Sequence, residues 1–106
     1  MDKVFRYVFS HSTNGDIQYQ YFTLEEIESG IALDSRKEKE NEGYELIARN
    51  IYTGLADKDS RAIYEDDLVF ATYNHLGTRR VELVNGEYSV AKFNLSKCKV
   101  TGTIFD

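Results

Sequence analysis

The sequence contains no proline and no tryptophan, and Cys98 is its single cysteine. One cysteine cannot form a disulfide within the chain, which suits a reducing compartment. Without proline, sharp turns depend on glycine, asparagine, aspartate and serine. No window approaches the roughly 18 to 20 apolar residues that cross a bilayer as a helix, and the first residues lack the apolar core of a signal peptide. We therefore expect a cytoplasmic protein with no membrane association.

Positive charge is also scarce, because 13 Lys and Arg residues face 18 Asp and Glu residues, which leaves a net charge of −5. This balance disfavours general binding to a nucleic-acid backbone and favours a basic protein partner. The length of 106 residues and the hydrophobic share of 42% fit one globular domain. Because the 8 Tyr and 6 Phe residues favour strands, we predict one mainly β domain over residues 1–106.

The N-terminal part, residues 1–43, begins with a predicted hairpin. Val4–Phe9 and Ile17–Phe22 have strand composition, and the Asn14-Gly15 pair between them is a turn signal. Residues two apart in a strand share a face, so we expect two sets of side chains to form one side of the core. The sets are Phe5, Tyr7 and Phe9 on the first strand and Ile17, Tyr19 and Tyr21 on the second.

One short helix is expected after this hairpin. Thr23 and Glu26 have the spacing of a capping box, in which each side chain bonds the backbone amide of the other residue. Gly30 is a natural helix terminator. The run Asp34–Gly43 has no apolar residue, which predicts either a solvated loop or a charged helical turn outside the core. The apolar residues at helical spacing are Leu24, Ile27 and Ile31.

The C-terminal part, residues 44–106, contains short segments of strand composition separated by turn residues. The Asn85-Gly86 pair is a strong signal for a type I′ hairpin turn. Short strands joined as hairpins favour closure, because closure removes exposed sheet edges. We predict a small, partly closed SH3-like β-barrel here, and hence a mainly β, α+β fold for the chain. The predicted strands are Tyr44–Tyr52, Leu68–Tyr73, Arg79–Val84, Glu87–Phe93 and Lys99–Phe105.

Period-two alternation also assigns the faces of the first of these strands. One face carries Glu45, Ile47, Arg49 and Ile51, and the other carries Tyr44, Leu46, Ala48, Asn50 and Tyr52.

Acidic residues cluster between Asp57 and Asp67, where a metal site or acid–base chemistry has to be considered. Asp57 and Asp59 match the first and third ligand positions of an EF-hand loop, but positions five, six and twelve carry arginine, alanine and leucine. Glu65, Asp66 and Asp67 alternate in direction at a strand entrance, which suits solvation better than a catalytic pair. We interpret the stretch as a bend held by hydrogen bonds from side chains to the backbone.

No other segment carries a complete catalytic or cofactor motif. His11 and His75 lie in predicted turns without a spaced partner ligand, and Cys98 lies on the predicted apolar face of the last strand. Gly54 and Gly77 are not part of a glycine-rich phosphate loop. We therefore expect no enzyme, no cofactor and no metal.

Four basic residues on or beside consecutive predicted strands define a tentative nucleic-acid patch. With Tyr88 or Phe93 nearby for base stacking, such a set can bind single-stranded nucleic acid. Glu82 and Glu87 dilute the positive charge, so an ordinary solvated strand face explains the same pattern. Nucleic-acid binding is thus the alternative to protein binding. The four residues are Arg79, Arg80, Lys92 and Lys99.

The segment YTGLADKDSRAIYEDDLV, residues 52–69, resembles the signature of the YopX family of bacteriophage and prophage proteins. The closing KVTGTIFD, residues 99–106, is similar to that family's last strand. Two positions depart from the pattern, because Ser60 and Asp66 stand where the family often has glycine, although aspartate tolerates left-handed backbone better than most residues. The motif residues in this chain are Tyr52, Thr53, Gly54, Leu55, Asp57, Ile63, Tyr64, Glu65 and Asp67.

The resemblance implies a β-rich, barrel-containing phage protein without established enzymatic activity, and it supplies no catalytic residues. Small acidic phage proteins often bind host proteins or adjust phage gene expression. We predict a non-enzymatic interaction module that acts on a host or phage protein, with an accessory nucleic-acid-binding or gene-regulatory factor as the alternative. A homo-oligomer is a further expectation, since an exposed edge strand or apolar patch can pair with a second copy.

Overall fold

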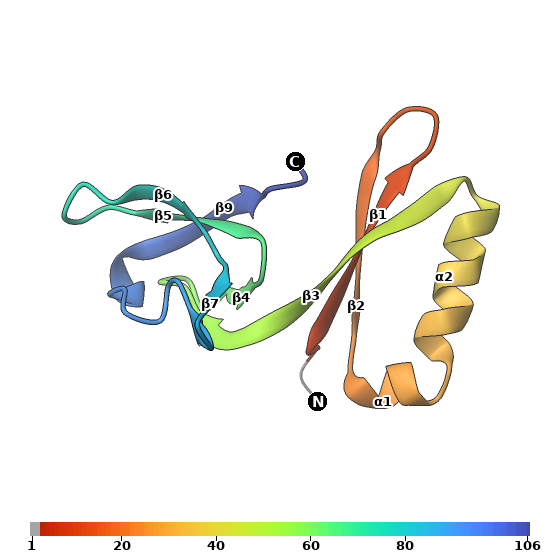
Figure 1. Cartoon of the computed structure of the whole chain (residues 1–106), viewed down its shortest axis with the longest axis horizontal. Coiled ribbons are helices and arrows are strands. Elements are labelled where there is room, and N and C mark those ends of the chain that lie inside the picture. Colours follow the sequence, from red (N-terminus) through yellow and green to blue (C-terminus); the bar gives the residue numbers. More distant parts are fainter. Residues whose placement is uncertain (1–2) are drawn as a thin grey trace. The chain divides into compact units, whose positions relative to one another are not determined.

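The structure is a computed structural model that describes residues 3–106 (Figure 1). The chain divides into two compact units, with the boundary between Ile51 and Tyr52. Strand β3 (Tyr44–Ala56) contributes its first part to the N-terminal unit and its last part to the C-terminal unit. The predicted division after residue 43 falls at the start of this strand, whereas the boundary between the compact units lies after Ile51. Among residues 3–106, no helix is both long and apolar enough to cross a bilayer.

The N-terminal unit is a small antiparallel sheet followed by two helices. β1 (Phe5–His11) lies between β2 (Ile17–Phe22) and the first part of β3. α1 (Leu24–Glu28) and α2 (Ile31–Asn41) connect β2 to β3. The predicted hairpin between β1 and β2 is confirmed by their continuous antiparallel pairing.

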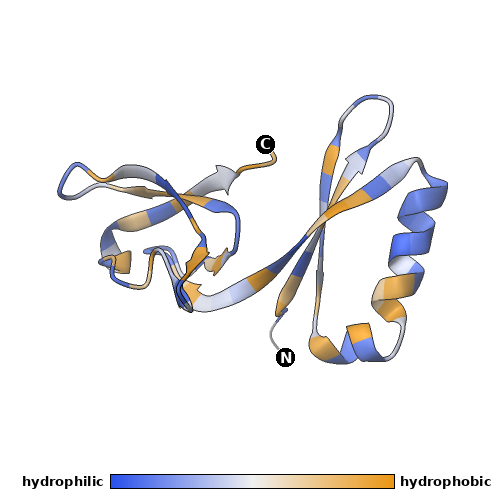
Figure 2. Cartoon of the chain, in the orientation of Figure 1, coloured by the Kyte–Doolittle hydropathy of each residue, from blue (hydrophilic) through white to orange (hydrophobic). Residues whose placement is uncertain are grey.

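The helices differ from the expectation of a single short helix. The capping box is confirmed, because Thr23 and Glu26 exchange hydrogen bonds of 2.9 and 3.1 Å. Gly30, at φ 90°, ends the first helix but also begins α2, which is 11 residues long. Only Ala32 of α2 is buried, and Figure 2 shows that hydrophilic residues cover most of this helix after its first turn. Its Glu, Lys and Arg residues are strong helix formers, so of the two alternatives for Asp34–Gly43, a solvated loop or a charged helical turn, the structure has the helical one.

The core face of β2 was wrongly assigned from its sequence. The register places Tyr7 opposite Gln20 and Phe5 opposite Phe22, so Phe22 shares the face of the first-strand aromatics. Tyr21 lies on the other face and is 41% exposed. Alternation shows that a strand has two faces, but the register of the hairpin decides which face meets the partner's core face. The buried cluster of this unit consists of Tyr7, Phe9, Phe22 and Ala32.

A β-bulge changes the faces of β3. The register shifts between Val8 and Phe9, so that Leu46 lies opposite Phe9 while Arg49 lies opposite Tyr7. Since Tyr7 and Phe9 share one face, Leu46 and Arg49 also share it, although regular alternation would separate residues three apart. The predicted two-face division of Tyr44–Tyr52 is therefore wrong beyond the bulge.

The C-terminal unit consists of short strands, and the mainly β class is confirmed. β5 lies between β6 and β9 in one sheet, β7 pairs with β8, and β4 pairs with the last part of β3. The Asn85-Gly86 turn is confirmed, with φ angles of 52° and 80° and with Val84 opposite Glu87. The strands are β4 (Ala62–Tyr64), β5 (Asp67–Ala71), β6 (Gly77–Arg80), β7 (Leu83–Val84), β8 (Glu87–Tyr88) and β9 (Cys98–Thr103), with a 3₁₀ turn at Leu95–Lys97.

These strands curl into a partly closed barrel. The bend that follows β3 bonds the start of β9, because the Lys58 N–H donates to the Cys98 carbonyl over 3.0 Å. On the other side, the Asp66 N–H donates to the Val81 carbonyl and the Val81 N–H donates to the Asp67 carbonyl, each over 2.9 Å. The barrel encloses its own buried cluster of Ile63, Val69, Ala71, Val81, Val90, Cys98 and Val100.

Two predicted strands are interrupted or cut short by turns in the structure. Arg79–Val84 is interrupted at Val81, whose backbone bonds the bend before β5 and so cannot continue a regular ladder. Glu87–Phe93 ends at Tyr88, because the chain then turns with hydrogen bonds from Ala91 to Tyr88 and from Phe93 to Val90. Turn bonding between near neighbours is not visible in an apolar pattern, which explains the difference.

Candidate protein-binding surface

The first motif residues form the β3–β4 hairpin. Tyr52 lies opposite Tyr64, and their ring centroids are 5.6 Å apart. The Thr53 hydroxyl donates to the carbonyl of Ile63 over 2.7 Å, across the same strand pair. Gly54 has φ 82°, a backbone region that favours glycine. These residues therefore build and bend the hairpin.

Asp57 holds the bend after β3 to the barrel. Its Oδ1 accepts the N–H groups of Asp59 and Arg61 over 2.9 and 3.0 Å, and its Oδ2 accepts the N–H of Val100 over 2.9 Å. Burial by itself raises the pKa of this carboxyl, but the three backbone hydrogen bonds outweigh it and hold the pKa below its ordinary value. Asp57 is thus an ionised structural group that binds backbone, as the bend interpretation proposed.

The second bend, between β4 and β5, uses its acids in a similar way. Buried Asp67 accepts the N–H of Tyr64 over 2.8 Å. Asp66 has φ 66°, and Ser60 in the first bend has φ 62°. Both residues that replace the expected glycines therefore adopt the left-handed backbone that a glycine would occupy. Glu65, which directly precedes Asp66, is half-buried.

The candidate ligand groups are dispersed. Among the residues from Lys3 to Asp106, no three His, Cys, Asp or Glu side chains are placed to hold a metal ion. His11 packs edge-on against Tyr44, with ring centroids 5.0 Å apart, and its Nδ1 accepts the Thr13 N–H. Cys98 is buried, and this burial together with the Asp57 carboxylate raises the pKa of its thiol. These surroundings suit structural side chains better than reactive ones.

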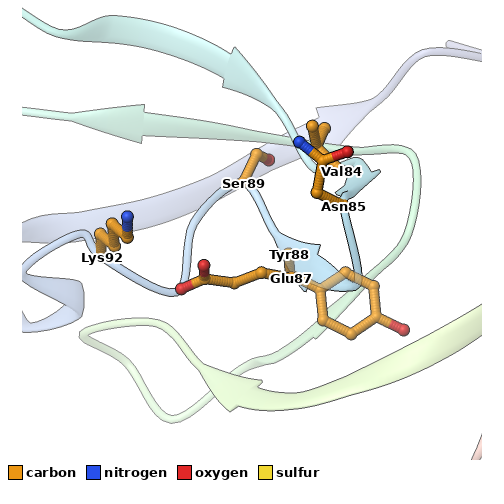
Figure 3. Close-up of a pocket in the computed structure, with 6 residues that line it drawn as sticks. All are labelled: Val84, Asn85, Glu87, Tyr88, Ser89 and Lys92. Carbon is orange, nitrogen blue, oxygen red and sulfur yellow. The ribbon is translucent and has the colours of Figure 1, made fainter.

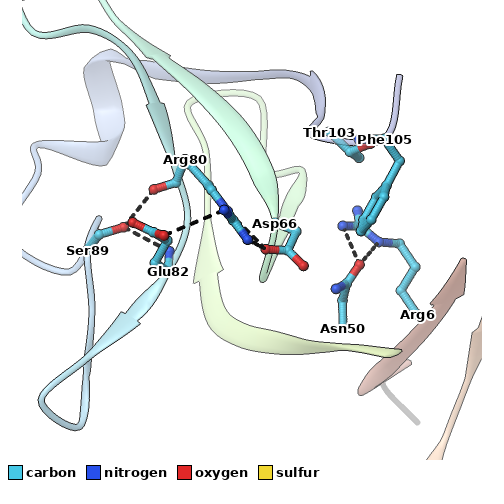
Figure 4. A network of polar contacts seen from close by, with 8 residues as sticks. All are labelled: Arg6, Asn50, Asp66, Arg80, Glu82, Ser89, Thr103 and Phe105. Carbon is cyan, nitrogen blue, oxygen red and sulfur yellow. Dashed lines mark hydrogen bonds and ion pairs between the residues drawn. The ribbon is translucent and has the colours of Figure 1, made fainter. Parts of the chain in front are cut away.

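The predicted basic residues do not form one patch. Arg80 binds Asp66 through two nitrogens at 3.1 and 2.8 Å and lies 3.7 Å from Glu82 (Figure 4). Its pKa is raised mainly by the hydrogen bond to Asp66. Arg79 is opposite inward-facing Val69, whereas Arg80 is opposite Leu68, so the two arginines leave opposite faces of the sheet. Lys92 lies outside this sheet, in the turn after β8.

An exposed aromatic residue accompanies part of this basic set. Phe70 is 42% exposed, and it lies between Thr78 on β6 and Lys99 on β9. The aromatics proposed for base stacking, Tyr88 and Phe93, are instead half-buried against the barrel core. Sequence reasoning missed Phe70, although period two could have paired it with Leu68 on the face opposite Val69.

The β7–β8 hairpin carries the two most exposed large apolar side chains among the described residues of the barrel unit. Leu83 is 54% exposed and Val84 is 53% exposed. Adjacent residues of a strand point to opposite faces, so neither face of this two-stranded ribbon is covered at Leu83 and Val84. Sequence reasoning located the turn of this hairpin but assigned its strands to the barrel wall.

The base of the hairpin is fixed while its tip projects. The Ser89 hydroxyl donates to the Arg80 carbonyl over 2.9 Å and accepts the Glu82 N–H over 3.0 Å (Figure 4). The Ser89 N–H also donates to the Glu82 carbonyl over 2.8 Å. Three bonds at one residue hold both ends of the ribbon together, so the exposed apolar residues are presented on an ordered element.

A cavity of about 310 Å³ lies against this hairpin, and Figure 3 shows the side chains around it. It combines an apolar wall with an amide, a hydroxyl, one carboxylate and one ammonium group. Burial, and then the nearby Glu65 carboxylate, raise the pKa of Tyr88, which is neutral at pH 7. The lining residues are Val84, Asn85, Glu87, Tyr88, Ser89 and Lys92. We call Leu83 together with these six residues the hairpin surface.

Comparison with known proteins gives no relative from which a role can be transferred. No protein-family model matches the chain, and no curated protein matches it.

Proposed function

We propose that the chain is a small non-enzymatic interaction module that binds a protein through the hairpin surface. The supporting observation is the exposure of Leu83 and Val84 on the two faces of an ordered hairpin, with Val84 lining a cavity. Exposed apolar groups rimmed by polar residues are typical of protein-binding sites, because burying them on association is favourable. Burial of such groups contributes about 25 cal/mol per Å² of apolar area removed from water.

The charge around the hairpin surface favours a basic, apolar partner segment. Glu82 and Glu87 flank Leu83 and Val84, and Lys92 is the single cation that lines the cavity. The whole chain carries a net charge of −5, which steers basic partners towards it.

The resemblance to the YopX family adds the biological setting of this proposal. A phage or prophage protein of this kind acts on a host or phage protein in the bacterial cytoplasm. The Ser60 and Asp66 positions support the resemblance, because their left-handed backbone is what the family's glycines accommodate.

Affinity capture from phage-carrying bacterial cells tests the proposal. The wild-type chain is compared with a Leu83→Ser, Val84→Ser variant and with an Ile31→Ser, Leu33→Ser control, whose residues are 50% and 52% exposed on α2. We expect a partner, identified by mass spectrometry after nuclease treatment, that the wild type and the control retain and the hairpin variant loses. Equal recovery by all three chains, or no specific protein, would overturn the proposal.

An accessory nucleic-acid-binding role is the second proposal, and Phe70 is the observation that favours it. Lys99 lies opposite Phe70 on the neighbouring strand, which combines an exposed aromatic platform with a positive charge. Fluorescence anisotropy with a labelled single strand measures binding between low and physiological salt. We expect binding that weakens as salt rises and is lost in Phe70→Ala, since phosphate contacts release counterions. Salt-independent binding would exclude this role.

Self-association is also part of the proposal, since exposed apolar side chains can pack against the same side chains of a second copy. Light scattering after size-exclusion chromatography measures the mass in solution. A monomer at every concentration, for the wild type and the hairpin variant alike, would exclude a homo-oligomer.

A further inference from the structure

A second surface lies in the N-terminal unit, along one edge of β3. Residues 44–49 of this strand pair with β1 on one side. Within the part of the chain that the structure describes, no strand pairs with their other side, because β4 lies opposite Tyr52 and Ala56 only. A strand edge of this kind can accept the backbone of an added extended segment.

The β-bulge determines which side chains lie along this edge. It places Arg49 on the same face as Leu46, which is also the face covered by α2. There, Arg36 of α2 and the β3 residues line a shallow, open pocket with a volume of about 300 Å³. We call this cavity the edge pocket, and its lining residues are Arg36, Leu46, Ile47, Ala48 and Arg49. Without the bulge, Arg49 would leave the opposite face of the strand.

The two guanidinium groups at the edge pocket retain hydrogen-bonding capacity. Arg36 uses its Nε on Glu40 over 2.8 Å, and a guanidinium carries five N–H donors in all. Arg49 lies over the ring of Tyr7, 5.6 Å from its centroid, and among residues 3–106 it makes no ion pair. The ring fixes the guanidinium without neutralising its charge.

We propose that the edge pocket binds an acidic peptide segment in extended conformation. Carboxylates of the segment pair with Arg36 and Arg49, because a guanidinium matches a carboxylate with two parallel hydrogen bonds. The backbone of the segment adds to the edge of β3, and its apolar side chains cover Ile47, which is 44% exposed. An inorganic anion would use the arginines but not the strand edge or the apolar wall. This proposal is independent of the hairpin surface, which lies in the other unit.

Three synthetic peptides test the edge pocket: fluorescein-labelled Asp-Val-Asp-Val-Asp, its Asn-for-Asp analogue and its Lys-for-Asp analogue. Fluorescence anisotropy measures the affinity, and NMR follows the backbone amides of Leu46 to Arg49. We expect the acidic peptide to bind at least about tenfold more tightly than the Asn peptide, because the Asn peptide cannot form the charge-assisted hydrogen bonds to the arginines. The amides of the edge pocket should shift with the acidic peptide only.

The double variant Arg36→Gln, Arg49→Gln should lower the affinity for the acidic peptide by at least about tenfold. The control variant Arg79→Gln, at an exposed residue, should leave this affinity unchanged. Dispersed amide spectra for both variants establish that they fold. No amide shift with millimolar acidic peptide, or equal binding of all three peptides, overturns the proposal. Full displacement by equimolar inorganic phosphate overturns it as well, because the pocket is then a general anion site.

Discussion

The acidic bends at Asp57 and Asp67 and the β7–β8 hairpin are both rich in turn residues and acids, yet they use their side chains in opposite ways. Asp57 and Asp67 are buried and direct their carboxylates at backbone N–H groups. In the hairpin, Leu83 and Val84 are exposed beside the acidic residues. A cluster of acids in a sequence therefore does not by itself indicate a site, because burial and hydrogen-bond partners decide its role.

The largest expected effect comes from removing the carboxylate of Asp57. Asp57→Ala leaves the buried N–H of Val100 and two bend amides without their acceptor, so we expect a loss of about 3 kcal/mol in the free energy of unfolding. Urea unfolding measures it. Asp59→Ala is the control, since Asp59 is exposed, and its change should stay within about 0.5 kcal/mol. Equal effects of both substitutions would contradict the structural role of Asp57.

The same carboxylate makes stability depend on pH in the acid range. Because the pKa of Asp57 is below its ordinary value of 3.8 when folded, its ionised form stabilises the protein above that value. This contribution is lost as the pH falls from 3.8 through the lower folded pKa. Asp57→Asn should therefore flatten the stability profile between neutral and acidic pH, measured by thermal unfolding. An unchanged slope in this variant would show that other carboxyl groups cause acid unfolding.

The next prediction contrasts a buried and an exposed apolar residue that are two positions apart. Val81 is fully buried in the barrel core, whereas Leu83 is 54% exposed in the hairpin. Val81→Ala should lower the free energy of unfolding by about 2 kcal/mol, because it removes buried methyl groups and leaves a cavity. Leu83→Ala should change stability by less than about 0.5 kcal/mol. Chemical denaturation of both variants measures the contrast, and a large loss for Leu83→Ala would make this residue part of the fold instead of a binding surface.

The sequence predicts the elements that local rules control. Capping at Thr23, the turn at Asn85-Gly86 and the mainly β class follow from short-range hydrogen bonding and side-chain shape. It leaves α2 open between a loop and a helical turn, because a helix formed by propensity alone has no apolar stripe to reveal it. Nor does it predict the faces of β2 and β3, since register and bulges depend on pairing between distant segments.

For the candidate surfaces, too, local turns could be predicted from the sequence, whereas features that depend on pairing between distant segments could not. The carboxylate of Asp57 bonds the amides of its own bend, and such turn bonding is local. The edge pocket depends on the bulge in β3 and on α2, neither of which the pattern of Tyr44–Tyr52 contains. The hairpin surface was missed for a related reason, since Val84 has the same apolar character as Val81 and only the fold distinguishes exposed from buried.

The smallest expected effect is a gain in stability at the first bend. Ser60 has φ 62°, a left-handed conformation that costs a side chain more than it costs glycine. Ser60→Gly removes this strain but adds backbone freedom to the unfolded chain, so we expect a net stabilisation of only about 0.5 kcal/mol. Ser12→Gly is the matched control, because Ser12 is an exposed turn residue without positive φ and should lose stability instead. Thermal unfolding compares the two variants. A loss in both would mean that the bend holds its left-handed backbone without strain, and that the departures at Ser60 and Asp66 say little about the glycines of the YopX family.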